Sequence, residues 1–229
     1  MQATRTQIIQ ANVKELIENF DKFLREYDSR PPFQKYGQFE YHQNTISFRM
    51  REISATNAIS NDLFLKSLYQ TLKAWGIGLR GSHLSPYSEF KKALQSKVNQ
   101  IADLDGLRID DPQLDIQRLS NDLWQLIDSL AIVQNNAKLV ACSKALHHIL
   151  PDLVVPLDRA YTRKFFGWHG PEFQYNQKKF LFLAIETFAT IARTTNPEQY
   201  VGKRWNTSQT KVIDNAIVGY MMIHPRTDL

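Results

Sequence analysis

Apolar residues recur at the spacing of a helical face along most of the chain. Within residues 6–28, Ile9, Val13 and Leu16 lie three or four positions apart, and acidic and basic side chains lie on the other side of the helix. This period is typical of an amphipathic α-helix. The paired prolines that follow cannot continue a helix, so the predicted helix ends before them.

The same period, together with start and stop signals, predicts a mostly helical chain. Ser60 has the position of an N-cap, and Ser85 followed by Pro86 is typical of a helix start. Further helices are predicted over residues 61–76, 87–104, 110–133, 137–150, 159–167, 177–195 and 207–223. With the first helix this makes about eight helices.

Residues 33–53 have a different pattern. Apolar and polar residues alternate there in places, which favours a short hairpin or an extended arm. No alternation of strands and helices follows, so a parallel nucleotide-binding sheet is not expected.

The predicted fold is therefore all-α. We expect two helical lobes with a cleft between them, residues 1–130 forming the first and residues 131–229 the second. A single compact unit is the alternative, because 229 residues suit one large domain as well as two small ones.

Composition narrows the class of protein. Hydrophobic residues make up 43% of the chain and charged residues 22%, as in soluble globular proteins. No apolar run reaches the about 18–20 residues of a membrane span. The N-terminus lacks the pattern of a secretory leader, and the single cysteine, Cys142, excludes disulfides and thiolate clusters. We expect a cytoplasmic, monomeric protein without cofactor or metal.

The net charge of +5 is concentrated in one region. Residues 158–211 contain nine Lys and Arg against four acids, an excess equal to the charge of the whole chain. A basic region of this kind suits a polyanion such as double-stranded DNA, although ordinary surface lysines would give the same count.

Asp158 occupies an unusual position within this region. A helix stops at Pro151, a short apolar run leads to Pro156, and the carboxylate then stands at the start of a cationic helix. Such an aspartate is either a helix cap alone or a cap that is also a catalytic acid facing a bound polyanion.

The segment from Pro156 to Gly167, "PLDRAYTRKFFG", resembles the helix-hairpin-helix DNA glycosylases. Members of that family have a helix followed by "PVDTHVxRxxxRLG", and Pro156, Asp158, Arg163 and Gly167 fall on similar roles. An archaeal 8-oxoguanine glycosylase branch, whose hairpin lacks the usual glycines, is nearer in character. The resemblance covers about 30 residues.

Two features depart from the family. Residues 133–140 contain no glycine where the hairpin is expected, and Val140 stands where bifunctional members place a Schiff-base lysine. Lys138 and Lys144 lie nearby. We therefore expect a monofunctional reaction, in which water attacks the sugar.

The resemblance implies hydrolysis of the N-glycosidic bond of a flipped, damaged or modified nucleotide, in repair or in defence. Asp158 would assist the water, and Lys144 would be a nucleophilic amine or a phosphate contact. The candidate residues for binding the base are Trp75, Arg80, His148, Trp168 and Trp205. The candidate contacts to DNA phosphates are Arg159, Arg163, Lys164, Lys203, Arg204 and Lys211.

Other readings remain open for these residues. Lys144 and His148 are one helical turn apart and line either a pocket or a solvated face. Residues 202–211 combine three basic side chains with Trp205 and form either a phosphate site or a solvated loop. For the whole chain, the alternatives are a non-catalytic nucleic-acid-binding protein and a helical module whose basic surface binds an acidic protein.

Overall fold

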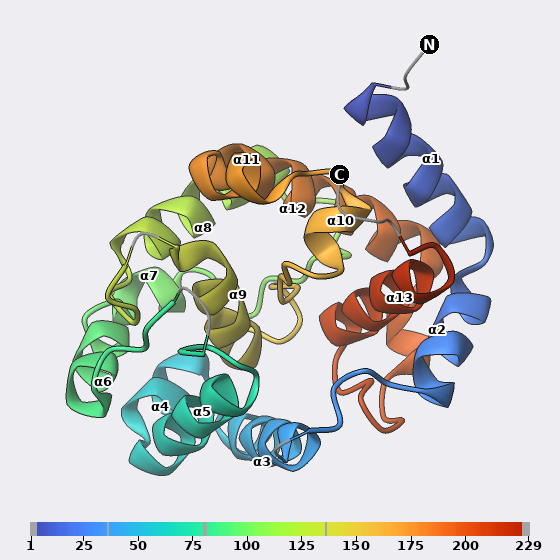
Figure 1. The fold of residues 1–229 in the computed structure, drawn as a ribbon. Helices are drawn as coiled ribbons and strands as arrows, with labels where there is room; N and C mark the ends of the chain where they lie inside the picture. The colour runs from blue at the N-terminus through green and yellow to red at the C-terminus, as the bar shows by residue number, and fades with distance from the viewer. Residues whose placement is uncertain (1–3, 36, 80–81, 136, 226–229) are drawn as a thin grey trace.

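The computed structural model describes residues 4–35, 37–79, 82–135 and 137–225, and they form an all-helical fold (Figure 1). Within these ranges the extended pairing is limited to two isolated bridges, Leu84 with Val133 and Lys203 with Asn206. The predicted fold class is confirmed. None of the helices in these ranges is long and apolar enough to cross a membrane.

The described ranges contain thirteen α-helices and one 3-10 helix, where about eight helices were predicted. The first seven are α1 (Arg5–Glu18), α2 (Phe20–Ser29), α3 (Gln38–Arg51), α4 (Ala55–Ser60), α5 (Asp62–Ala74), α6 (Tyr87–Gln95) and α7 (Val98–Ala102). The others are α8 (Ile116–Ser129), α9 (Lys138–Ile149), α10 (Thr162–Phe165), α11 (Gly170–Tyr175), α12 (Gln177–Thr195), η1 (Pro197–Tyr200) and α13 (Gln209–Ile223).

Two of the five additional α-helices come from breaks within predicted helices, and the other three, α3, α4 and α11, lie where no helix was predicted. The segment 6–28 is divided at Asn19, whose backbone N–H still bonds to Glu15 while α2 begins at the next residue. The segment 87–104 breaks at Ser96 and Lys97. An apolar period continues through such breaks, because both helices bury the same side, so the pattern alone does not reveal them.

The prediction of a hairpin or arm is wrong for residues 38–51, which form α3. Its buried residues are His42, Thr45 and Ile46, at the spacing of one helical face. Two of the three are polar, so a search for apolar periodicity does not detect the buried face.

The start of α5 also differs by one residue. Asn61, not Ser60, caps it, and the Asn61 side chain accepts hydrogen bonds from the backbone of Leu63 and Phe64. Ser60 is the last residue of the short helix α4.

Two helices pass through the interior and carry the residues discussed below. Ten of the twelve residues of α9 and thirteen of the fifteen residues of α13 are buried. Helix α9 packs against α3, α4, α5 and α8, whereas α13 packs against α1, α2, α10 and α12. In Figure 1, α3 to α8 accordingly lie on one side of the molecule, and α1, α2 and α13 lie on the other. A division at residue 130 stays a prediction.

The contact between α13 and α2 is unusually close at Gly219. A β-carbon added there would lie 2.0 Å from the carbonyl oxygen of Phe23, a backbone atom that cannot turn aside. We expect Gly219→Ala to lower the free energy of unfolding by about 3 kcal/mol or more, because overpacking forces the two helices apart. Chemical denaturation would measure the loss.

Gly170→Ala is the matched control, since a β-carbon at Gly170 meets nothing within 4 Å. It should change stability by less than about 1 kcal/mol. Equal stability of the two variants would contradict the close packing of α13 on α2.

Candidate active site

Asp158 lies where the chain leaves the interior and turns toward α10. Its Oδ1 accepts hydrogen bonds from the backbone N–H of Ala160, at 2.6 Å, and of Tyr161, at 3.1 Å. Its backbone N–H donates to the hydroxyl of Thr162. Asp158 therefore caps the turn that precedes α10, and α10 itself begins at Thr162, three residues later than the predicted helix start.

The approach to Asp158 is fixed to α9. The hydroxyl of Ser143 accepts from the backbone N–H of Leu157 at 3.1 Å, and the ring of His147 bonds to the carbonyl of Val154 at 3.1 Å. Both anchors come from a buried helix, so they hold the segment before Asp158 at a set distance from α9.

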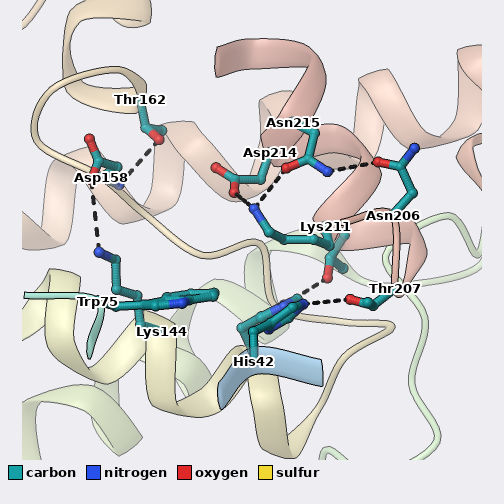
Figure 2. A network of polar contacts seen from close by, with 12 residues as sticks. His42, Trp75, Lys144, Asp158, Thr162, Asn206, Thr207, Lys211, Asp214 and Asn215 are labelled. Carbon is teal, nitrogen blue, oxygen red and sulfur yellow. Dashed lines mark hydrogen bonds and ion pairs between the residues drawn. The ribbon is translucent and has the colours of Figure 1, made fainter. Parts of the chain in front are cut away.

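The second oxygen of Asp158 faces Lys144. Asp158 Oδ2 lies 3.8 Å from the ammonium nitrogen of Lys144, whose side chain is only 10% exposed (Figure 2). One carboxylate thus caps a turn with one oxygen and presents the other to a buried cation. A role as a cap does not use up the carboxylate, so both readings of Asp158 fit this geometry.

A small cavity adjoins this pair, with about 450 Å³ of empty space including its opening to solvent. Its aromatic walls are Phe33, Trp75 and Trp205. Its polar lining consists of Gln38, Lys144, Asp158, Lys211 and Asp214, and Pro156 and Leu157 complete it. The cavity therefore joins flat apolar faces to two cations and two carboxylates.

Lys211 lies inside the fold rather than on its surface. It is 2% exposed, and its ammonium donates to Asp214 Oδ2 at 2.5 Å and to Asn215 Oδ1 at 2.7 Å (Figure 2). The Asn215 amide donates in turn to Asn206 at 2.7 Å. Since an ammonium has three donors, one of them is left for a further acceptor.

Aromatic rings surround the same ammonium. Its nitrogen lies between 5.5 and 5.9 Å from the ring centroids of Tyr27, Phe33, Trp75 and Trp205, a range typical of cation–π contacts. Burial raises the pKa of the Asp214 carboxyl, against the opposing effect of Lys211. The ion pair is thus enclosed by rings and by neutral amides.

Three buried histidines lie behind the tryptophans. The ring of His148 bonds through Nδ1 to the carbonyl of Lys144 at 2.7 Å, so Nδ1 carries the proton and Nε2 is an acceptor. His42 Nδ1, 2.9 Å away, must then donate to it. His42 Nε2 is left to accept from the hydroxyl of Thr207 at 2.8 Å (Figure 2). One set of tautomers satisfies every bond in this chain.

These histidines are neutral. Burial, above all, lowers the pKa of His42 and of His147 well below 6.5, and it lowers the pKa of His148 to about 4. His147 lies beside the other two and bonds through Nδ1 to Val154 and Thr210.

The structure brings together five of the predicted site residues. Lys144, Asp158, Trp75 and Trp205 line the cavity, and Lys211 joins them there, although it was expected at a DNA phosphate. His148 lies behind the walls and is fully buried. Arg80 lies outside the described residues.

Trp168 is placed elsewhere. It is 2% exposed, packs edge-on against Phe180, and has the guanidinium of Arg5 over its ring, 4.5 Å from the centroid. It belongs to the region between α1 and α12, so it does not line the cavity.

The remaining basic residues lie outside the cavity. Arg159, Lys203 and Arg204 are exposed, and Arg163 and Lys164 are partly buried. Arg163 is held by the carbonyls of Arg159 and Trp168. The exposed ones come from the two segments that carry Asp158 and Trp205.

Several site residues were missed from the sequence. His42 and Phe33 lay in the segment 33–53, which was predicted as a short hairpin or an extended arm. Asp214 and Asn215 follow Lys211 by three and four positions within an apolar helix, and polar residues at that spacing in such a helix are a signal of a buried polar network. Within the described residues no group of histidine, cysteine and acidic side chains is arranged to hold a metal ion.

Comparison of the chain with protein-family models, with curated proteins and with solved structures gives no match. The function must therefore be argued from the site.

The histidines make stability depend on pH. A histidine whose pKa is lower in the folded protein than in the unfolded chain contributes its full stabilisation when the pH is above the unfolded pKa, near 6.5. This contribution to the free energy of unfolding is lost as the pH falls toward the folded pKa, which is about 4 for His148. Between about pH 7 and pH 4.5 the wild type should lose about 2 kcal/mol more than His148→Gln. Urea unfolding at the two pH values measures this difference.

Three carboxyls have the opposite effect on the pH dependence of stability, because burial raises the pKa values of Asp28, Asp152 and Asp214. Because these carboxyls are present in both proteins, the difference between wild type and His148→Gln does not contain their contribution. His83→Gln, at an exposed histidine, should match the wild type at both pH values. Parallel pH curves for wild type and His148→Gln would refute a buried neutral His148.

Proposed function

We propose that the protein is a DNA N-glycosylase that hydrolyses the bond between a flipped nucleobase and its sugar. The observation that carries the proposal is the pair formed by Asp158 and Lys144 at the edge of a cavity with aromatic walls. A carboxylate beside flat stacking surfaces is the arrangement that this reaction requires.

The chemistry assigns a task to Asp158. When the bond between C1′ and the base nitrogen breaks, its electrons leave with the base and positive charge develops on the sugar. Asp158 Oδ2, which is not used in the cap, stabilises that charge and takes a proton from the water that attacks C1′. The products are the free base and a sugar with a hydroxyl at C1′.

The cavity offers polar groups that suit the edge of a base. The third donor of Lys211 suits an acceptor atom of the base, and the buried carboxylate of Asp214 suits a ring N–H or an amino group. Trp75 and Trp205 supply faces for stacking, at about 1–3 kcal/mol per base. Lys211 is thus proposed as a contact to the base rather than to a phosphate.

Exposed cations near the cavity support a DNA partner. Arg159 follows Asp158 directly, and Lys203 and Arg204 precede Trp205, so backbone contacts and base contacts come from the same segments. Arg204 has a positive φ of 47° and is fixed by a bond to the carbonyl of Asp28.

The position of Lys144 supports a second route. Its amine lies in the cavity beside Asp158, although it does not match the lysine position of the bifunctional glycosylases. Attack by this amine on C1′ would expel the base and form a covalent imine with the opened sugar. Water attack remains the first proposal, because the Lys144 nitrogen is paired with Asp158 Oδ2.

The test is base release from a panel of duplexes with damaged and modified bases, in single turnover. We expect Asp158→Asn to lower the rate by about 10²- to 10⁴-fold, the usual contribution of such a group. The asparagine keeps an oxygen for the cap of Ala160 and Tyr161, so the local fold should survive. Duplex affinity should not change, since phosphate contacts dominate it.

Asp128→Asn, at an exposed carboxylate, is the control and should have the wild-type rate. Borohydride distinguishes the two routes. It traps an imine formed by Lys144 as a covalent adduct of protein and DNA, whereas water attack gives no such adduct. Intact DNA binding without release from any duplex would favour the non-catalytic nucleic-acid-binding protein. Binding of an acidic protein but not of DNA would favour the interaction module.

The salt dependence of binding tests the exposed cations. We expect Arg159→Gln to reduce the slope of log Kobs against log salt by about 0.9, the value for one lost phosphate contact. Arg118→Gln, whose side chain is 81% exposed on α8, should leave the slope unchanged. A fluorescence titration at several salt concentrations measures both, and equal slopes would remove Arg159 from the interface.

A further inference from the structure

His42 contacts both tryptophans of the cavity while being fully buried itself. Its ring centroid lies 5.2 Å from that of Trp75, with an interplanar angle of 33°, and 5.4 Å from that of Trp205, with an angle of 19°. The two indoles come from distant segments, the end of α5 and the loop before α13. His42 is thus an aromatic spacer shared by both.

Hydrogen bonds prevent this spacer from turning. Nδ1 donates to His148 and Nε2 accepts from Thr207, so rotation of the ring would break both bonds. Thr207 is two residues from Trp205, and the series of hydrogen bonds from Thr207 through His42 and His148 ends at the carbonyl of Lys144. One line of hydrogen bonds therefore ties the loop of Trp205 to the helix of Lys144.

We propose that His42 is a positioning residue, which sets the distance and orientation of the two indole walls and so decides whether a flat base fits against them. The inference rests on the proposed function for the identity of the ligand. His42 does not line the cavity, so it acts through Trp75 and Trp205 and not on the reacting atoms.

The geometry explains why a histidine suits this position better than another ring. Phenylalanine would supply an aromatic face but would leave the acceptor of His148 and the hydroxyl of Thr207 without partners. Asparagine keeps a donor near the place of Nδ1, and glutamine keeps an acceptor near the place of Nε2. Each of these amides retains one bond and loses the ring.

The test compares His42→Phe, His42→Asn and His42→Gln in single-turnover excision. We expect His42→Phe to lower the rate by about 10- to 100-fold, because small misplacements of binding groups have effects of this size. The two amides should be impaired as well, and the duplex Kd should stay at the wild-type value. His83→Asn, at an exposed histidine, should match the wild type throughout.

Thr207→Val covers the case in which variants of His42 do not fold. It removes one hydroxyl of a partly buried residue and leaves the His42 ring in place without its second bond. As for His42→Phe, we expect slower excision and an unchanged duplex affinity. A purely structural role would instead lower the thermal stability and the duplex affinity together.

Near-UV circular dichroism gives a readout that does not depend on catalysis. Trp75→Phe and Trp205→Phe define the part of the spectrum that comes from the two walls, and His42→Phe and Thr207→Val should alter that part. Wild-type rates together with an unchanged spectrum would overturn the inference. If the wild type excises no base, the proposed function fails and the spectrum alone decides the role of His42.

Discussion

The buried ammonium of Lys211 is the constraint on which the centre of this protein depends. An ion that leaves water loses several kcal/mol of solvation, which a single partner does not offset. Here Asp214 supplies the counter-charge, Asn215 accepts a second hydrogen bond, and four aromatic rings surround the nitrogen. Those rings come from α2, the connection after it, the end of α5 and the loop before α13, so these elements must meet around one charge.

The neutral histidines extend this arrangement toward α9. His42, His148 and Thr207 form a chain in which every donor has an acceptor, and the chain ends beside the backbone of Lys144. Helices α9 and α13 are buried on nearly all sides, so polar groups on them must find partners within the protein. The charged pair and the histidine chain both satisfy this requirement, and Lys211 and Asp214 also line the cavity.

In the proposed reaction, Asp158 serves structure and chemistry together. Its Oδ1 accepts from two backbone amides, which fixes the carboxylate, and its Oδ2 faces Lys144 at the cavity. A carboxylate held in this way needs no rearrangement before it acts, which is the condition for efficient electrostatic stabilisation of developing charge. The same turn brings the exposed Arg159 next to it, and this joins the proposed chemistry to the proposed binding of DNA.

The sequence by itself determined the all-helical class, the helix of the α13 segment and the capping position of Asp158, because helical period, caps and prolines act over a few residues. It did not determine α3, since polar His42 and Thr45 occupy its buried face, or the break at Asn19, since an apolar period continues across it. Only the tertiary structure decided that Trp205 and not Trp168 lines the cavity, and that Lys211 lies inside the protein. Those outcomes depend on contacts between residues far apart in the chain, such as His42 with Trp205 and Lys211 with Tyr27, which no local pattern records.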